Sequence, residues 1–396
     1  MASKNGGFIG TDGLDAPDAP TIDSVSAGGA SISVSFTAPT DTGTSAITGY
    51  VAQASTDGTA YSAGSGTGTS SPITISSLTN GTAYTAKVWA INAYGTSAPS
   101  GASDSATPIA PRAVIALGQH NVTGNKEEID YFDISSTGNA SDFGNLSNTR
   151  VAMGSGGGSS TRGMWAGGTG GNNIGDIIDY VTIATTGNAT DFGNLISATQ
   201  GCSSLSNSTR FITGGGSNSP SQNRIQYVTI ASTGNAQDFG DLTKNKAEFY
   251  STANSTRGLW FTKGSGNNNE IEYVTIATTG NGTDFGDMTV SCESAAALAS
   301  STRALHGGGS GDLVDIGYVT IASTGNATDF GDLTVGRTRM DGTSSSTRGV
   351  FAGGITGTGT IDYVTIASTG NATDFGDMTQ GTQFTSATSA AHGGLQ

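Results

Sequence analysis

The sequence predicts an all-β protein in which a small β-sandwich precedes an array of repeated four-stranded sheets. One phrase, Ile-Asp-Tyr-Val-Thr-Ile-Ala-Ser-Thr-Gly-Asn-Ala-Thr-Asp-Phe-Gly-Asp in its last copy, recurs six times at intervals of about 45–49 residues. A fixed period of this size is typical of repeat proteins. Apolar and polar residues alternate in short runs, as in half-buried strands. Glycine makes up 62 of the 396 residues, which fits many tight turns.

The first 108 residues contain a polar segment and then the predicted sandwich. Residues 1–15 are rich in glycine and polar groups, and we expect them to be a flexible or anchoring segment. In residues 30–36, Ile32, Val34 and Phe36 alternate with polar residues and point to one side of a strand. Turn signals such as Asn80-Gly81 separate the runs. Residues 16–108 are therefore predicted to form a β-sandwich.

Residues of this segment carry a family resemblance. Phe36 stands where fibronectin type III domains usually have tryptophan, and residues 78–84, Leu-Thr-Asn-Gly-Thr-Ala-Tyr, match the tyrosine corner. Residues 47–50 and 90–97 match further strands. The segment 16–108 thus resembles a fibronectin type III domain, which is immunoglobulin-like. The resemblance implies a spacer or a binding module.

Residues 109–396 are the repeat array, and one repeat contains four short predicted strands. In the third repeat these strands are residues 201–206, 210–213, 225–230 and 238–242. Four antiparallel strands in so short a repeat are typical of one β-propeller blade. Six tyrosine strands predict six blades, and seven blades with one incomplete is the alternative. We expect the C-terminal strand to complete the first blade and close the ring, which would leave no open sheet edge.

The order of features in each repeat also resembles a kelch repeat. An arginine, an apolar strand, a double glycine, a tyrosine strand and an aromatic residue follow one another. Phe239 stands where kelch repeats usually have tryptophan. This resemblance implies a kelch-like propeller over residues 112–396.

An arginine and an aspartate recur in every repeat. Equal copy number suggests that they pair, once per blade or between blades, because planar Arg–carboxylate pairs suit partly buried interfaces. The competing interpretation is a ring of ligand-binding arginines, and we favour structural ties. The predicted ties are Arg162, Arg210, Arg257, Arg303 and Arg348 with Asp191, Asp238, Asp284, Asp329 and Asp374, and the first copies are Arg112 and Asp142.

The sequence offers no candidate for catalysis, a metal or a cofactor. The carboxylates belong mostly to the repeat, and identical copies do not provide the two distinct environments that acid–base catalysis needs. Three histidines and two cysteines lack metal-site spacing. His306 and His392 are predicted to occupy the same place before Gly-Gly in different blades. Trp165 and Trp260 could form a stacking platform for sugars, and inter-blade core is the interpretation we favour.

The loops after the double glycine differ between repeats in length and content, whereas the strands are nearly identical. Variable loops on a rigid scaffold are where recognition usually occurs, and neutral drift in exposed turns is the alternative. The candidate binding residues in these loops are Asn172, Asn173, Asn218, Ser219, Gln222, Asn223, Asn267, Asn268, Asn269 and Asp312.

The composition limits the partners. A net charge of −15 disfavours binding to nucleic acid or to anionic lipid. The N-terminus has no apolar stretch of signal-peptide length.

The chain resembles virion structural proteins of tailed bacteriophages in three features. These are the nearly identical repeats, a surface of Ser, Thr, Gly and Asn, and the leader Asn5-Gly6-Gly7-Phe8-Ile9-Gly10. This resemblance implies a non-catalytic tail-fibre or capsid-decoration protein, present in several copies and located in the virion. The N-terminal segment would contact other virion proteins, and the propeller would contact host-surface glycan or a neighbouring subunit. The alternatives are an extracellular carbohydrate-active propeller enzyme, a bacterial adhesin and a cytosolic kelch scaffold. The enzyme would require an asymmetric cluster of acids and aromatic residues on one face, which the sequence does not indicate.

Overall fold

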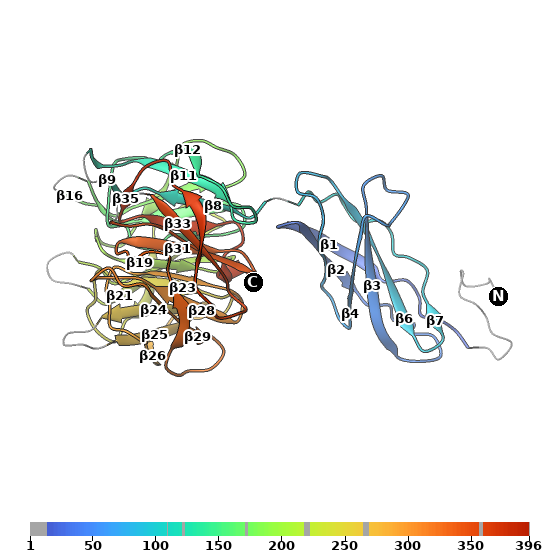
Figure 1. Cartoon of the computed structure of the whole chain (residues 1–396). Helices are drawn as coiled ribbons and strands as arrows, with labels where there is room; N and C mark the ends of the chain where they lie inside the picture. Colours follow the sequence, from blue (N-terminus) through green and yellow to red (C-terminus); the bar gives the residue numbers. More distant parts are fainter. Residues whose placement is uncertain are drawn as a thin grey trace. The chain divides into compact units, whose positions relative to one another are not determined.

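The computed structural model describes residues 14–108, 110–120, 123–170, 173–217, 222–263, 269–355 and 359–395. The chain divides into two compact units between residues 110 and 111. Both units are built of β-strands (Figure 1). Among the described residues, no helix has the length and apolar character needed to cross a membrane.

The first unit is a sandwich of two antiparallel sheets. Ile32, Val34 and Phe36 lie in its core, as the alternation predicts. The hydroxyl of Tyr84 accepts a hydrogen bond from the backbone N–H of Thr79 at 3.1 Å, which is the contact expected of a tyrosine corner. One sheet has the order β1-β2-β5 and the other β4-β3-β6-β7, with β1 (Thr21–Gly28), β2 (Ser31–Thr37), β3 (Ile47–Ser55), β4 (Gly64–Gly68), β5 (Ile73–Ile75), β6 (Thr85–Asn92) and β7 (Gly95–Thr96).

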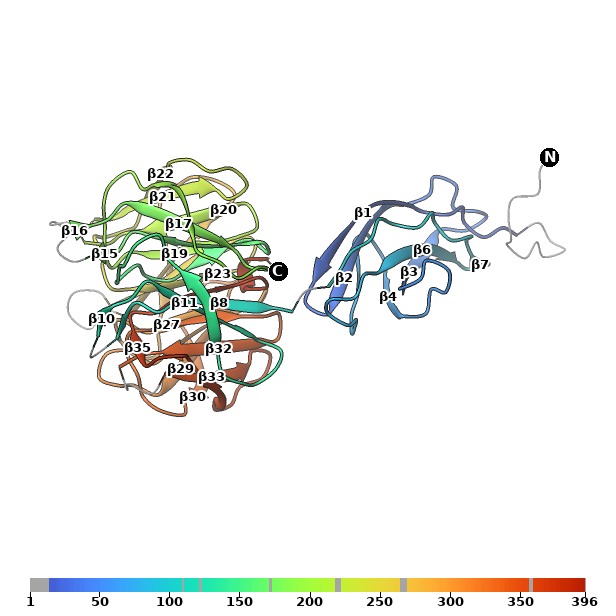
Figure 2. The ribbon, with the colours of Figure 1, turned by 90° about the horizontal axis from the view of Figure 1, so that it is seen from above.

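The second unit consists mainly of six four-stranded antiparallel sheets (Figures 1 and 2). We number them 1 to 6 in chain order. Sheet 1 is β12-β11-β8-β36 and joins the two ends of the unit, with β8 (Arg112–Ala116), β11 (Glu128–Asp133), β12 (Ser141–Asn145) and β36 (Ser386–Ser389).

The other five sheets each use four strands that are consecutive except for one short hairpin. They are sheet 2, β13 (Gly157–Gly158), β14 (Arg162–Ala166), β17 (Ile177–Thr182) and β18 (Thr190–Asn194); sheet 3, β19 (Ser203–Ser206), β20 (Arg210–Gly214), β21 (Arg224–Thr229) and β22 (Gln237–Asp241); sheet 4, β23 (Tyr250–Ala253), β24 (Arg257–Lys263), β25 (Asn269–Thr275) and β26 (Thr283–Asp287); sheet 5, β27 (Ala296–Ala299), β28 (Arg303–Gly307), β29 (Asp315–Thr320) and β30 (Thr328–Asp332); and sheet 6, β31 (Met340–Ser344), β32 (Arg348–Gly353), β33 (Thr360–Thr365) and β34 (Thr373–Asp377).

Short elements lie at the edges of these sheets. Two small sheets are β10-β9-β35 and β15-β16, with β9 (Gln119–His120), β10 (Gly124–Asn125), β15 (Thr169–Gly170), β16 (Asn173–Ile174) and β35 (Thr382–Gln383), and the described chain ends in a 3-10 turn, η1 (Gly393–Leu395).

The first strand of each sheet, or β36 in sheet 1, contacts the corresponding strands of its neighbours. The contacts run from β36 to β13, β19, β23, β27 and β31, and then from β31 back to β36. We call these six the inner strands. Apolar side chains pack between successive sheets; for example, Phe351 of sheet 6 belongs to the same cluster as Leu298 and Leu305 of sheet 5. The core of the second unit is therefore divided among the interfaces of neighbouring sheets.

The repeated arginines connect each sheet to the next. Nη1 of Arg210 donates to the backbone oxygen of Ile276 in the following repeat at 2.8 Å, and its guanidinium lies 4.7 Å from the ring centroid of Tyr227. Arg348 reaches Ile134 of the first repeat at 2.8 Å. The remaining pairs are Arg112 with Ile183, Arg162 with Ile230, Arg257 with Ile321 and Arg303 with Ile366.

The predicted pairing of these arginines with the repeated aspartates is wrong. Among the described residues, no ion pair joins Arg162, Arg210, Arg257, Arg303 or Arg348 to Asp191, Asp238, Asp284, Asp329 or Asp374. These aspartates are exposed on the fourth strand of each sheet. The arginines instead extend to carbonyl oxygens of the next sheet, so the two sets point to different places.

Buried carboxylates before the repeated tyrosines provide a second connection. Asp179 in β17 accepts hydrogen bonds from Ser147 and pairs with Arg150 at 2.8 Å, and Asp362 pairs with Arg337 at 2.7 Å. In sheet 1 the equivalent Asp130 accepts from the N–H and the hydroxyl of Thr379. Burial raises the pKa of Asp130 to about 6 although these donors oppose the shift.

The repeated Asp-Phe-Gly string is explained by close packing. Gly376 has a φ of 147°, and a Cβ there would lie 2.5 Å from the carbonyl oxygen of Gly138 in the first repeat. Only glycine allows the fourth strand to approach the turn of the next repeat so closely. The string is a packing device of the sheet.

We predict that Arg210→Met lowers the free energy of unfolding of the second unit by about 2 kcal/mol, because one charged hydrogen bond and one cation–π contact are lost. Urea unfolding followed by tryptophan fluorescence measures this change. Arg224→Met is the control, since the only side-chain contact of Arg224 with the described residues is a longer one, of 3.3 Å to Ser197. Equal losses in the two variants would contradict the structural role of the repeated arginine.

Candidate functional site

The inner strands all begin at one end of the second unit, and the variable loops start beside them. Val151 pairs with Thr169, and Gln200 pairs with Ser217, where the loops after the double glycines leave sheets 2 and 3. In sheet 5 the N–H of Ser310 donates to the carbonyl of Glu293 in the same way. The loop bases therefore surround the starts of the inner strands.

Six residues, one before or near the start of each inner strand, form a rim at this end. All six have left-handed backbones, with φ between 55° and 61°. The rim residues are Ala152, Gly201, Glu248, Ser294, Arg339 and Phe384. From Gly201 onward, each N–H donates to the carbonyl of the preceding rim residue at 2.7–3.1 Å. This hydrogen-bonded arrangement makes the rim rigid.

The rim keeps side chains at positions where glycine would be less strained. A left-handed backbone costs an L-residue roughly 1–2 kcal/mol, yet only Gly201 is glycine. Glu248 is exposed, whereas Arg339 and Phe384 are partly buried. Strain retained at one register in several repeats is a reason to look for function there.

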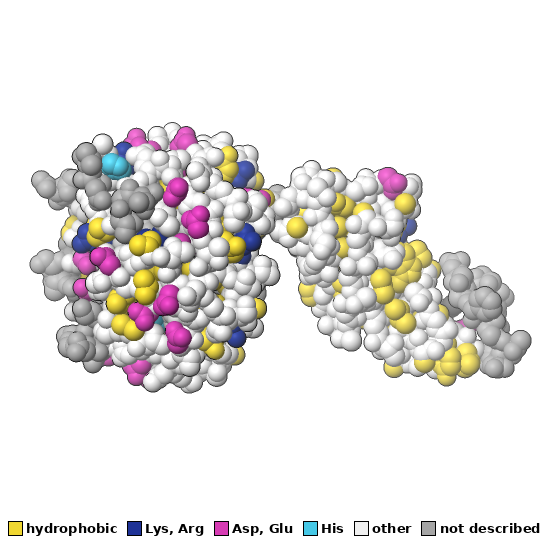
Figure 3. All heavy atoms as spheres, viewed as in Figure 1, with side chains coloured by type: hydrophobic (Ala, Val, Ile, Leu, Met, Phe, Trp, Pro, Cys, Tyr) yellow, Lys and Arg dark blue, Asp and Glu magenta, His cyan; other side chains and the backbone are white. Residues whose placement is uncertain are grey.

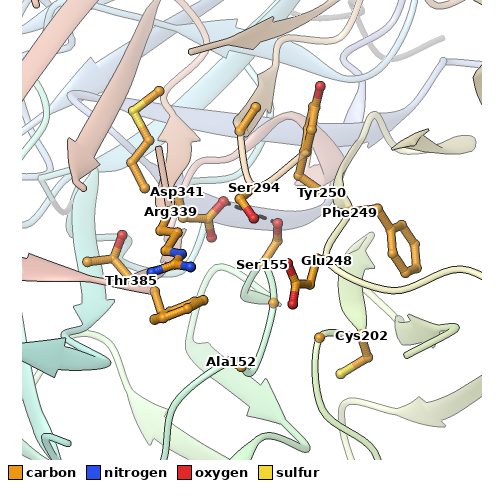
Figure 4. A pocket seen from close by; sticks show the side chains of 15 residues that line it. Ala152, Ser155, Cys202, Glu248, Phe249, Tyr250, Ser294, Arg339, Asp341 and Thr385 are labelled. Carbon is orange, nitrogen blue, oxygen red and sulfur yellow. Dashed lines mark hydrogen bonds between the residues drawn. The ribbon is translucent and has the colours of Figure 1, made fainter. Parts of the chain in front are cut away.

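The rim surrounds a cavity of about 60 Å³ whose lining comes from all six sheets (Figure 4). Figure 4 places Arg339 and Glu248 on different sides of this cavity, with Ser155 between them. The guanidinium of Arg339 lies 4.4 Å from the ring centroid of Phe384 and donates to Oε1 of Gln383 at 2.9 Å. The opening thus presents a cation, a carboxylate and an aromatic ring.

Asp341 lies below the rim and is 2% exposed. Its Oδ1 accepts from Ser155 of sheet 2 at 3.1 Å, and its Oδ2 accepts from the N–H of Ala387 of sheet 1 at 2.7 Å. Burial raises the pKa of Asp341 to about 7, although these donors and the N–H groups of Gly342 and Gly156 oppose the shift. Because its oxygens accept hydrogen bonds from residues at sheets 6, 1 and 2, Asp341 acts as a structural clamp between these sheets.

Two other potentially reactive side chains near the cavity, Cys202 and Tyr250, are buried. Burial raises the pKa of the Cys202 thiol to about 12, so it is protonated at neutral pH and is a poor nucleophile. The hydroxyl of Tyr250 is directed to Met288 Sδ and Cys292 Sγ at 3.0 and 3.1 Å. Cys202 and Cys292 are buried and form no disulfide. Among the described residues, no group of three or more His, Cys, Asp or Glu could hold a metal ion.

The C-terminal turn lies at the other end of the inner strands. Nε2 of His392 is 3.1 Å from the carbonyl of Gly158, and the buried Gly393 and Gly394 pack against Ala253, Ala299 and Ser206. Burial lowers the pKa of His392 to about 4. His306 lies instead within β28, packed beside the stacked, buried rings of Phe261 and Tyr250. The prediction that His306 and His392 occupy equivalent places is wrong, because the final Gly-Gly forms a turn and does not end a strand.

The predicted loop residues have different positions. Asn172, Asn218, Ser219, Asn267 and Asn268 lie outside the described residues, as does the side chain of Asn173. Gln222 accepts from Ser197, and the amides of Asn223 and Asn269 donate to the carbonyls of Leu242 and Met288. These three side chains hold the loop bases, and their role in binding stays a prediction. Asp312 is exposed.

Trp165 and Trp260 are fully buried, which excludes a stacking platform and agrees with the core interpretation. The indole N–H of Trp165 donates to the carbonyl of Ser386 at 2.9 Å and so connects sheet 2 to β36.

The residues that surround the cavity were not predicted from the sequence. Glu248, Asp341 and Phe384 come from three repeats and line this cavity together, a cluster of acids and an aromatic ring that the sequence did not indicate. A signal was present. Glu248, Ser294 and Arg339 each stand nine residues before the repeated arginine, and this one register carries a different residue in each copy.

Comparison with known proteins identifies the first unit. Residues 15–105 match the model of the Fibronectin type III domain. A search of curated proteins found no match to the chain.

Proposed function

We propose that this chain is a non-catalytic structural protein of a tailed-phage virion, which displays a six-bladed β-propeller for contact with host-surface glycan or a neighbouring subunit. The fibronectin type III domain is the spacer in this proposal, and the N-terminal segment contacts other virion proteins. Several copies in one particle would convert weak contacts into strong attachment.

The propeller part of the proposal is supported by the contacts of the inner strands. They run through six sheets and return from β31 to β36. The tie from Arg348 to Ile134 and the contact of Thr379 with Asp130 connect sheet 6 to sheet 1 in the manner of the other neighbours. A closed arrangement of six blades accounts for all of these contacts, and seven blades would require a further sheet.

The observation that carries the binding role is the rim. Its hydrogen-bonded backbone holds Glu248, Arg339 and Phe384 at an opening that the described bases of the variable loops surround. Rigid support with variable side chains is what recognition requires. The surface favours polar partners, since Figure 3 shows few Lys or Arg and scattered acidic groups on the viewed face.

A carbohydrate-active enzyme is the second candidate, and the cluster of Glu248, Asp341 and Phe384 favours it. Hydrolysis of a glycoside usually needs two carboxyl groups flanking the bond. Asp341 is buried and its oxygens accept from Ser155 and Ala387, which leaves Glu248 as the accessible carboxylate of the described rim. Binding is therefore the better conclusion.

Mass spectrometry of purified phage particles from the source sample tests the virion proposal. We expect this chain at a fixed ratio to the major virion proteins. Detection only in the culture fluid or on cells would overturn the proposal and favour the enzyme or adhesin alternatives.

A further inference from the structure

We propose that the rim binds the uncharged, hydroxyl-rich end of a saccharide chain, with Arg339, Glu248 and Phe384 as the contact residues. This inference deepens the proposed function and rests on it for the source of the saccharide. It assigns the ligand to the axial opening and not to the outer loops.

The guanidinium of Arg339 is held in a fixed position by neighbouring side chains. Phe384 supports its guanidinium on one face, and Gln383 accepts from Nη1 at 2.9 Å. Gln383 in turn donates to Gln119 at 3.0 Å, and Gln119 donates to Asn125 at 3.1 Å. A guanidinium fixed by this chain of amides loses little entropy on binding. Within the described part of the chain, its other terminal nitrogen has no partner.

Glu248 supplies the opposite charge. Its N–H and carbonyl are fixed by Gly201 and Ser294, while its carboxylate is exposed and makes no side-chain hydrogen bond to a described residue. A carboxylate only accepts hydrogen bonds and a guanidinium only donates them. Hydroxyl groups can do both, so neighbouring hydroxyls of a sugar satisfy Glu248 and Arg339 together.

Charge disfavours ionised ligands at this site. An anionic group would meet Glu248 and a chain of net charge −15. A cationic group would meet Arg339. The pair of opposite charges at one small opening therefore selects a neutral polar group.

The size of the cavity limits how much of the ligand enters. About 60 Å³ is far below the roughly 300–1,000 Å³ of pockets that enclose a whole small molecule. A hydroxymethyl group or a pair of ring hydroxyls can enter, and the C–H face of the sugar then lies against the partly buried Phe384. Such a site recognises the terminal residue of a chain and not its middle.

Saturation-transfer NMR on the full chain tests this inference. The probes are the methyl glycosides of glucose, galactose, mannose and N-acetylglucosamine, with methyl glucuronide and glucosamine as anionic and cationic comparisons. We expect at least one neutral glycoside to bind with a dissociation constant on the order of 1 mM, and both charged probes to bind about tenfold more weakly. Glu248→Gln and Arg339→Gln should each weaken binding by about tenfold.

Asp332→Asn is the matched control, because Asp332 is exposed on the outer strand β30, away from the rim, and its loss should leave the affinity unchanged. Melting temperatures of all variants show that the fold is retained. No binding by any neutral glycoside, preferred binding of a charged probe, or unchanged binding by the Glu248 and Arg339 variants would each overturn the inference. In those cases the chain could still be a stoichiometric virion protein, so the two proposals fail separately.

Discussion

Deletion of residues 385–396 is expected to unfold the second unit while the fibronectin type III domain stays folded. β36 supplies the inner strand of sheet 1, where it pairs with β8 from Ser386↔Ala116 to Ser389↔Ala113. It also contacts β13 and β31, and Ser386 accepts from Trp165. Without it, three sheets lose partners at once. The loss should exceed the net stability of a domain, about 5–15 kcal/mol.

Scanning calorimetry of three chains measures this effect. The full chain should give two transitions, because the two units have separate cores. Deletion of residues 391–396 removes the turn η1 but keeps β36, and both transitions should remain, with the one of the second unit slightly lowered. Deletion of residues 385–396 should leave only the transition of the first unit. A retained second transition in this last chain would mean that β36 does not hold sheet 1 together.

Much of this fold could be predicted because the relevant signals are local. Alternation places Ile32, Val34 and Phe36 in the sandwich core, and the four strands predicted in the third repeat correspond to β19 to β22. Because the same pattern occurs in six copies, each strand prediction rests on six observations instead of one. Periodicity reports which face of a strand is buried, and burial is what forms these sheets.

The predicted pairing of the repeated arginines with the repeated aspartates is wrong because equal copy number does not show where either side chain points. Both residues occur once per repeat, but Asp238 lies on the outer strand and faces solvent, whereas Arg210 spans to Ile276 in the next sheet. The partner of Arg210 is a backbone carbonyl, and every residue of any sequence has one. No residue-type pattern could identify it.

The rim was missed for the opposite reason. Comparison of repeats draws attention to residues that recur, and the rim register carries a different side chain in each copy. Glu248, Arg339 and Phe384 are far apart in the sequence, and they meet only because successive sheets bring the same register to one end. Alignment of the copies on the repeated arginine places Gly201, Glu248, Ser294 and Arg339 nine residues before it, and this shared register is the signal that could have linked them.

Replacement of Asp341 should have the largest effect of any single substitution considered for the second unit. Asp341→Ala leaves the hydroxyl of Ser155 and the N–H of Ala387 without their acceptor in a buried place. Each such loss costs about 1–3 kcal/mol, so we expect a total on the order of 4 kcal/mol. Asp341→Asn should cost less, because its oxygen can still accept from Ala387 while the Ser155 hydroxyl rotates to accept from the amide.

The dependence of the unfolding free energy on pH distinguishes the Asp341 carboxyl from the buried histidines. Burial raises the pKa of Asp341 from 3.8 to about 7, so between these values the folded chain keeps a proton that the unfolded chain releases. Raising the pH from about 4 to about 7 therefore favours unfolding through this group. His306 and His392 act in the opposite direction between about 4 and 6.5, since burial lowers the pKa of each to about 4.

Urea unfolding of the wild-type chain and of Asp341→Asn across pH 4 to 8 isolates the effect, because the histidines are common to both and cancel in the difference. The stability advantage of the wild type over Asp341→Asn should shrink by a few kcal/mol as the pH rises from about 4 to about 7, and then remain constant. An advantage that is independent of pH would show that Asp341 is already ionised in the folded chain at pH 4. In that case the donors from Ser155, Ala387, Gly342 and Gly156 outweigh the cost of burial, and the clamp at the junction of sheets 6, 1 and 2 is a permanent charge.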